Sequence, residues 1–357
     1  MADKRTSATF REGSLDTLAQ NGTNFYHDST YKPAIIVTGL GSELGNDKVL
    51  KGKAKRKTIS QTMSLSLIEI AKRKGQTEKV KSLWNTYHCQ NKLYSIDGRL
   101  YGKYCKNRYC TLCCCNRKAD IINRYIPVIS HWEKPYFVTL TIKACKAPSL
   151  KKMLKGVIRG FRLITEKYRK RSQRSKGIKL IGIKSLECNF NPKQNTYNPH
   201  LHLIVANKEI AETLIKEWLI KWTPKFATRA AQHYRPIQDL QRDLIETIKY
   251  GSKIFTEPDV NKKAKSNTDN TIYTAALSNI FDGMKGLRIF DRFGFDLPKD
   301  AAKITTNAQV VNEYYEWEFS PEHFDWCNVD NELVLSAFAP TAGLSHILTN
   351  CIDTNAE

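Results

Sequence analysis

The chain has 357 residues, 41% of them hydrophobic and 10% aromatic, with 57 Lys and Arg against 35 Asp and Glu and a formal charge of +22. This apolar content supports a substantial buried core and excludes a purely solvating, disordered polymer. The sequence has no apolar run long enough to span a membrane and no apolar centre typical of a secretory signal, so we expect a soluble, cytoplasmic protein without membrane contact. The positive charge predicts a polyanionic partner, first of all nucleic acid, because basic side chains that neutralise phosphates release counterions.

The charge is unevenly distributed along the chain. Residues 304–357 contain nine acidic residues and no Lys or Arg, which leaves +31 on residues 1–303. We therefore expect the body of the protein to contact DNA. The acidic C-terminal region is expected to dock on a host protein or to cover the basic surface.

Composition and pattern divide the chain into four regions. We expect a partly ordered basic N-terminal arm with one helix near residues 65–71 (1–80), a cysteine-rich module (81–130), an α+β domain (131–256), and a linker with the acidic C-terminal region (257–357). No internal repeat is found.

The cysteine-rich module contains six of the ten cysteines, between Cys89 and Cys115. Such clustering in a long chain without an export signal favours metal over disulfides. The spacing Cys105-x4-Cys110-x2-Cys113, with Cys89 upstream, is typical of a structural zinc site with four thiolates. Interleaved basic residues are expected to contact DNA: Lys103, Lys106, Arg108 and Arg117. The alternative is a set of reduced, buried cysteines.

The α+β domain is predicted from clear periodicities. Residues 136–142 form a β-branched and aromatic run typical of a buried strand. From Ser149, a candidate N-cap, apolar residues recur with helical spacing, and the other helix face carries Lys151, Lys155 and Arg159 as candidate DNA contacts. The later elements are expected at 178–190 (strand), 200–206 (strand), 208–222 (helix), 232–237 (strand) and 239–253 (helix). This order predicts a central, mainly antiparallel sheet with flanking helices.

His200 and His202 occupy alternate positions of a predicted strand, so both imidazoles project from one face. Glu187 lies in an otherwise apolar stretch of the neighbouring strand, where a carboxylate needs a partner, and the hairpin brings it beside the histidines. Two imidazoles and one carboxylate suit Mg²⁺ or Mn²⁺. The alternative is an exposed strand face that holds two histidines, with Glu187 facing water.

Glu246, Tyr250 and Lys253 form a further candidate group. The first two are four residues apart and would share a helix face, with Lys253 one turn beyond Tyr250. A phenol is a weak nucleophile at neutral pH because its ordinary pKa is about 10. A nearby cation favours the phenolate, and a metal-polarised phosphodiester is a suitable target for it. The alternative is a solvated helix face.

In this order, these segments resemble the plasmid rolling-circle replication initiators (Rep proteins) of the single-tyrosine group within the HUH endonuclease superfamily. The segments similar to family motifs are, in chain order, the cysteine segment 104–113, the first-motif strand 137–141, the paired-histidine motif 199–203 and the tyrosine motif 249–253. The resemblance covers about residues 88–256. Asn198 stands where relatives often have a further His, and Thr111 where Pro is usual.

The resemblance implies a ferredoxin-like or RRM-like palm in residues 131–256, preceded by a zinc module. It implies a metal-dependent, strand-specific nickase and strand transferase that acts on plasmid origin DNA, double- and single-stranded, together with a host helicase and polymerase. Tyr250 would be the nucleophile that forms a 5′-phosphotyrosine, and Glu246 would activate water in the terminating reaction. Lys253 would stabilise negative charge, while Glu187 and the two histidines hold the metal ion.

Two other functions fit parts of the pattern. A transposase or mobilisation relaxase of the same superfamily would share the metal site and tyrosine, but such transposases carry a second tyrosine four residues away, where this chain has Glu246 or Ile254. A non-catalytic zinc-containing DNA-binding regulator would explain the charge and cysteines but leave the paired histidines and the Glu246/Tyr250 pair as coincidence.

Overall fold

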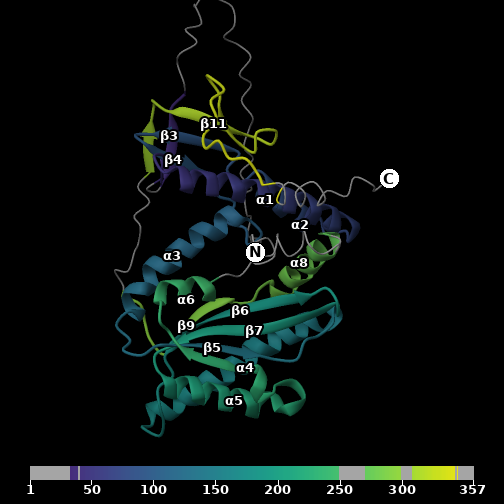
Figure 1. The fold of residues 1–357 in the computed structure, drawn as a ribbon, viewed down its shortest axis with the longest axis vertical. Helices are drawn as coiled ribbons and strands as arrows, with labels where there is room; N and C mark the ends of the chain where they lie inside the picture. Colours follow the sequence, from purple (N-terminus) through teal and green to yellow (C-terminus); the bar gives the residue numbers. More distant parts are fainter. Residues whose placement is uncertain (1–32, 39–40, 249–269, 299–307, 342–343, 345–357) are drawn as a thin grey trace, which may run out of the picture.

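The computed structural model describes residues 33–38, 41–248, 270–298, 308–341 and 344. Figure 1 shows a sheet with flanking helices in the lower part of the view and a second sheet beside the long helix α1 in the upper part. No helix within the described residues is long and apolar enough to cross a membrane.

The lower unit is built on an antiparallel sheet with the strand order β8-β5-β7-β6-β9. Its strands are β5 (Tyr136–Thr141), β6 (Gly182–Asn191), β7 (Thr196–Val205), β8 (His233–Pro236) and β9 (Phe290–Phe293). The predicted hairpin is confirmed as β6 and β7, which pair along ten residues each. The predicted strands at 136–142 and 232–237 are likewise confirmed. The fold class is therefore α+β, as the element order predicts.

Alternation along β7 assigns the helices to the two faces of this sheet. Leu201, Leu203 and Val205 point to one face and are buried against α4 (Ala147–Gln173), α5 (Lys208–Phe226) and α8 (Asn270–Met284). Ile204 points to the other face, which α3 (Thr111–Ile129) and α6 (Leu240–Thr247) cover. His200 and His202 share this second face with Ile204.

The upper unit combines both ends of the described chain. Its helices are α1 (Asp47–Arg73) and α2 (Thr77–Tyr87), and its sheet has the order β12-β11-β3-β4-β2. The strands are β2 (Ser42–Glu43), β3 (Lys92–Ile96), β4 (Arg99–Gly102), β11 (Tyr315–Ser320) and β12 (Asp325–Asn328). A separate ribbon pairs β1 (Ile35–Thr38) with β10 (Ala308–Val311).

Two regions differ from the expected organisation. The N-terminal arm contains the 27-residue helix α1, which buries many polar residues and so shows little apolar periodicity in the sequence. Beyond the expected boundary at residue 256, α8 joins the core of the lower unit, and β9 pairs with β6 at the sheet edge. The acidic region also contributes β11, which pairs with β3 in the upper sheet.

Helix ends also differ from the prediction. The N-cap of α4 is Lys146, not Ser149, because Pro148 fits the first helical turn and lets the helix begin at Ala147. α5 extends to Phe226 with a break at Thr223, which has a non-helical φ of 56°. Thr223 immediately precedes Pro224 in the chain. α6 begins after the N-cap Asp239, as predicted, and its assigned helix ends at Thr247.

Candidate functional site

The paired histidines meet the carboxylate on the face of the lower sheet that α3 and α6 cover. In the strand register, His200 lies opposite Glu187 of β6, and His202 lies opposite Thr139 of β5. Glu187 is 2% exposed, His200 4% and His202 9%. The three side chains predicted as metal ligands are therefore brought together in a nearly water-free position.

The distances within this triad fit a bound cation. Oε2 of Glu187 lies 3.6 Å from Nε2 of His200 and 3.5 Å from Nε2 of His202, and the three ligand atoms lie within 4.8 Å of one another. These separations are longer than good hydrogen bonds. Ligand atoms about 2.1 Å from one ion would lie about 3.0 Å apart at right angles and about 3.6 Å apart at 120°. The triad can thus hold a divalent ion with little movement.

Each imidazole is oriented by a contact of its second ring nitrogen, Nδ1. Nδ1 of His200 donates to the backbone carbonyl of Asn198 at 2.9 Å, which leaves the lone pair on Nε2 directed at Glu187. Nδ1 of His202 lies 3.2 Å from the hydroxyl of Thr139. The Asn198 amide oxygen in turn accepts a hydrogen bond from Thr141 at 2.9 Å. Such partners fix the ligand geometry of metal sites.

Sequence reasoning missed Thr139 and Asn198 as orienting residues, although both lie within or beside the motifs it singled out. The signal is the two-residue alternation: Thr139 and Thr141 on β5 face the same side as the histidines. Asn198 supports His200 through its backbone carbonyl, so the absence of a further His at this position leaves the triad intact.

The helix that carries Glu246 packs on the same face. Leu244 and Ile248 at the end of α6 are buried against Phe137 and Ile204, and Glu246 is half-buried. Arg235 of β8 binds Asp243 of α6 at 2.5 and 2.9 Å. Asp243 first and Glu246 less strongly raise the pKa of Arg235.

The remaining members of the second candidate group, Tyr250 and Lys253, lie outside the described residues. The expected helix over 239–253 can therefore be followed as far as Thr247, where the assigned α6 ends.

The four predicted cysteines form one cluster in the upper unit. The Sγ atom of Cys113 lies 3.7 Å from that of Cys89 and 3.6 Å from that of Cys105, and all four ligand atoms, including that of Cys110, lie within 4.8 Å. A tetrahedral ion with bonds of about 2.3 Å holds its sulfurs about 3.8 Å apart. The cluster fits one such ion.

The backbone around the cluster favours thiolates. The N–H groups of Cys105 and Lys106 point at the sulfurs of Cys89 and Cys113, at 3.3 and 3.2 Å. Cys110 is the N-cap of α3, so the positive end of that helix faces the cluster. Hydrogen bonds among the four thiols lower the pKa of Cys105 far below its usual range and raise the pKa of Cys89 and Cys113, so Cys105 is the preferred thiolate of the cluster.

A buried lysine ties helix α1 to the loop that carries Cys89. The Lys57 ammonium, 0% exposed, donates to the carbonyls of Tyr87 and Cys89 at 2.7 and 2.9 Å and to the amide oxygen of Asn91 at 2.5 Å. Burial lowers the pKa of Lys57 to about 8. Lys57 was not identified from the sequence, because a lysine in a basic run is usually solvated.

The candidate DNA contacts are distributed over several surfaces. Arg108 donates to the carbonyl of Leu287 at 3.3 and 3.4 Å and so connects the cysteine segment to the chain after α8. Arg117 donates to the carbonyl of Lys106 at 3.1 Å. Three of the exposed basic residues of α4, which packs on the sheet face opposite the Glu–His–His triad, are the predicted DNA contacts Lys151, Lys155 and Arg159. These three are therefore not brought together with the triad.

Comparison with known proteins supports a common family. A model of the replication protein family matches residues 99–289, more than half of the chain. The chain is 27% identical to a protein rep of Bacillus amyloliquefaciens over 146 residues, 39% of this chain and 41% of that protein. It is 26% identical to a protein rep of Streptococcus pneumoniae serotype 2 over 257 residues, 64% of this chain and 77% of that protein.

A protein rep of Staphylococcus aureus is 27% identical over 163 residues, which are 42% of this chain and 69% of that protein. A protein rep of an unspecified Bacillus species is 26% identical over 146 residues, and the match spans less than half of the length of each of the two Bacillus relatives. No solved structure matches the chain. The matched region contains the cysteine cluster from Cys105 onward and the whole Glu–His–His triad. The chain therefore belongs to the replication protein (Rep) family, in agreement with the resemblance of its motifs.

Proposed function

We propose that this Rep protein initiates plasmid rolling-circle replication by nicking one strand at the origin and rejoining it after one round. The observation that carries this proposal is the convergence of Glu187, His200 and His202 on the sheet face where α6 packs. Ile248, at the end of the described part of α6, is buried on that face, and Tyr250 follows two residues later in the sequence.

A divalent cation such as Mg²⁺ or Mn²⁺ bound by the triad would polarise the scissile phosphate. Residues of the chain carry out the bond-breaking and bond-forming steps. Tyr250 attacks phosphorus through its phenolate oxygen, the P–O3′ bond breaks, and the leaving 3′ oxygen takes up a proton. The products are a 5′-phosphotyrosine on the protein and a 3′-OH that a host polymerase can extend, with a host helicase separating the strands.

In the terminating reaction, Glu246 acts as general base for the water that cleaves the regenerated site, and Lys253 stabilises the negative charge on the phosphate. Because Tyr250 acts in initiation and Glu246 in termination, a single tyrosine is sufficient for one full round of replication. The half-buried position of Glu246 on the helix that precedes Tyr250 supports its role.

We further propose that the cysteine cluster binds structural zinc. Four thiolates, from Cys89 and from the closely spaced Cys105, Cys110 and Cys113, favour Zn²⁺ over the hard ions suited to the triad. Basic residues around it, Lys103 and Lys106 among them, are exposed and available to origin DNA.

The test is nicking of a supercoiled plasmid that carries the cognate origin. Tyr250→Phe is expected to abolish nicking while leaving DNA binding intact, and Glu246→Ala is expected to nick but fail to terminate. Persistent nicking by Tyr250→Phe would refute the assignment of the nucleophile. A wild-type protein that binds the origin but never nicks, with or without Mn²⁺, would favour the non-catalytic regulator.

A further inference from the structure

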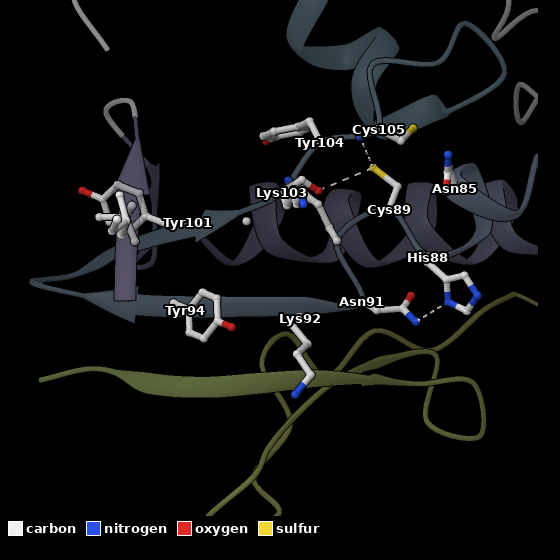
Figure 2. Close-up of a pocket in the computed structure, with 14 residues that line it drawn as sticks. Asn85, His88, Cys89, Asn91, Lys92, Tyr94, Tyr101, Lys103, Tyr104 and Cys105 are labelled. Carbon is white, nitrogen blue, oxygen red and sulfur yellow. Dashed lines mark hydrogen bonds between the residues drawn. The ribbon is translucent and has the colours of Figure 1, made fainter. Parts of the chain in front are cut away.

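A cavity of about 930 Å³ lies beside the cysteine cluster in the upper unit. Its wall is formed by the β3–β4 hairpin, by the end of α2 and the segment that follows it, by the start of the cysteine segment, and by Ile36 and Val37 of β1. Figure 2 shows the hairpin and the residues around Cys89 and Cys105 that line it. The metal triad and α6 do not contribute to it. The cavity therefore belongs to a surface separate from the proposed nicking site.

The hairpin presents aromatic and basic side chains to this cavity in a regular order. Tyr94 of β3 lies directly opposite Tyr101 of β4 in the antiparallel register, so the two rings share one face. Lys92 and Lys103 lie two residues from these tyrosines and share that face. On the other face, Leu93 and similar residues are buried in the core beneath α1.

Behind this face lies a buried amide. The side chain of Gln90 is 2% exposed and lines the cavity. It lies within hydrogen-bonding reach of the Tyr104 hydroxyl, and among the described residues the rest of its donors and acceptors have no hydrogen-bond partner. Leaving donors or acceptors of a buried amide without hydrogen bonds costs free energy of folding. The amide can be satisfied by a ligand that offers both donors and acceptors, as the edge of a nucleobase does.

One edge of the surface is acidic. Glu316 of β11 lies opposite Tyr94 in the register and binds the Lys92 ammonium at 2.7 Å. Glu318 follows two residues later, opposite Lys92. A polyanionic backbone would be repelled from β11, and Lys103 on the other side of the hairpin, exposed to solvent, would attract it. The charges thus orient a nucleic-acid strand on the surface.

We propose that this cavity binds a short single-stranded DNA segment, with bases stacked on Tyr94 and Tyr101, a base edge at Gln90 and phosphates near Lys103. A double helix hides the faces of its bases, whereas a single strand offers them to aromatic rings. The inference extends the proposed initiator function by naming the surface that holds the strand away from the nicking site.

The position of the cavity determines how many nucleotides separate the strand bound there from the scissile phosphate. α3 runs from the cysteine cluster to the core beside β5, and its 19 residues span about 28 Å. At about 3.4 Å per stacked nucleotide, this corresponds to roughly eight nucleotides. The cavity is therefore expected to bind DNA about eight nucleotides from the scissile phosphate.

The test measures binding by the full chain without added Mg²⁺ or Mn²⁺, so that nicking is not required. A short fluorescein-labelled oligonucleotide of mixed sequence is titrated as a single strand and, separately, as a duplex. Tyr94→Leu and Tyr101→Leu are each expected to weaken single-strand binding about 5- to 100-fold and to leave duplex binding nearly unchanged. Tyr101→Phe keeps the ring and should retain binding. Glu316→Gln releases Lys92 and should strengthen binding.

Lys103→Gln is expected to weaken single-strand binding, and Lys51→Gln, which removes an exposed charge of α1 away from the cavity, is its control. The proposal would be overturned by any of three results. The two glutamine variants could lose single-strand affinity equally, both leucine variants could bind single strands as the wild type does, or the leucine variants could lose single-strand and duplex affinity equally. These results are independent of nicking: a wild-type protein that fails to nick would contradict the proposed function while leaving a tyrosine-dependent single-strand site standing.

Discussion

The Thr139 hydroxyl offers a direct test of how the sheet organises the proposed metal site. It lies 3.2 Å from Nδ1 of His202, whose side chain is largely buried, so water cannot readily replace it. Thr139→Val removes this hydrogen bond while conserving the shape of the side chain. Loss of such an orienting partner typically costs 10- to 100-fold in metal affinity, about 1.4 to 2.8 kcal/mol at 25 °C.

Mn²⁺ binding to the full chain, followed by electron paramagnetic resonance, measures this effect. Thr139→Ser keeps the hydroxyl and is expected to bind Mn²⁺ nearly as well as the wild type. Thr165→Val is a matched control, because it removes a hydroxyl from α4 on the opposite side of the sheet. Unchanged Mn²⁺ affinity in a folded Thr139→Val variant, or equal losses for the Val and Ser variants, would refute the orienting role of this residue.

Three further predictions concern the upper unit. Cys113→Ser removes the thiol closest to two others and should abolish binding of one equivalent of Zn²⁺, measured by mass spectrometry of the native protein, whereas Cys188→Ser on β6 should leave it unchanged. Lys57→Met removes the donor of three hydrogen bonds, one to the buried carbonyl of Cys89 and two to the partly buried Tyr87 carbonyl and Asn91 amide oxygen. It is expected to lower the free energy of unfolding by about 2 kcal/mol in urea titrations; an unchanged midpoint would contradict the tie between α1 and the Cys89 loop. Burial lowers the pKa of Lys53 to about 8. Between about pH 8 and pH 10.5 the unfolded chain therefore binds more protons at this residue than the folded chain does. Lys53 thus makes the free energy of unfolding rise with pH in this range. Lys53→Met should therefore gain stability relative to the wild type at pH 7 and lose that advantage, up to about 3 kcal/mol, by pH 10.5; a pH-independent difference would refute the assignment.

The sequence predicts the sheet of the lower unit well because its signals are local. The β6–β7 hairpin follows from a strand, a turn rich in Asn and Pro and a second strand, and strand alternation places His200 and His202 on one face. The cysteine quartet follows from spacing within one short segment plus Cys89. In both cases the residues that meet in space are close in sequence or joined by a single turn.

What the sequence does not reveal depends on contacts between distant segments. α1 buries Lys57, Ser60 and Ser64 among its apolar residues, so its inner face is mixed and carries little hydrophobic periodicity. β9 joins the sheet from beyond the polar stretch that suggested a domain boundary. Nothing local marks such pairings.

The acidic C-terminal region shows the same limitation. Its charge suggested a surface for partners, yet Asp325 is 0% exposed and accepts hydrogen bonds from Trp326 and Ser336 at 2.8 Å. Glu316 pairs with Lys92 on the neighbouring strand. At least part of this acidic charge therefore serves the upper sheet itself, while docking on a host protein stays a prediction for the region.

The central claim is that Tyr250 becomes covalently joined to DNA at a site organised by Glu187, His200 and His202. The most direct measurement incubates the protein and Mn²⁺ with an origin oligonucleotide that traps the cleaved intermediate, followed by peptide mass spectrometry. We expect a 5′-phosphotyrosine adduct on Tyr250 that disappears in His202→Ala. An adduct on another residue, or one that forms equally well in His202→Ala, would contradict the account.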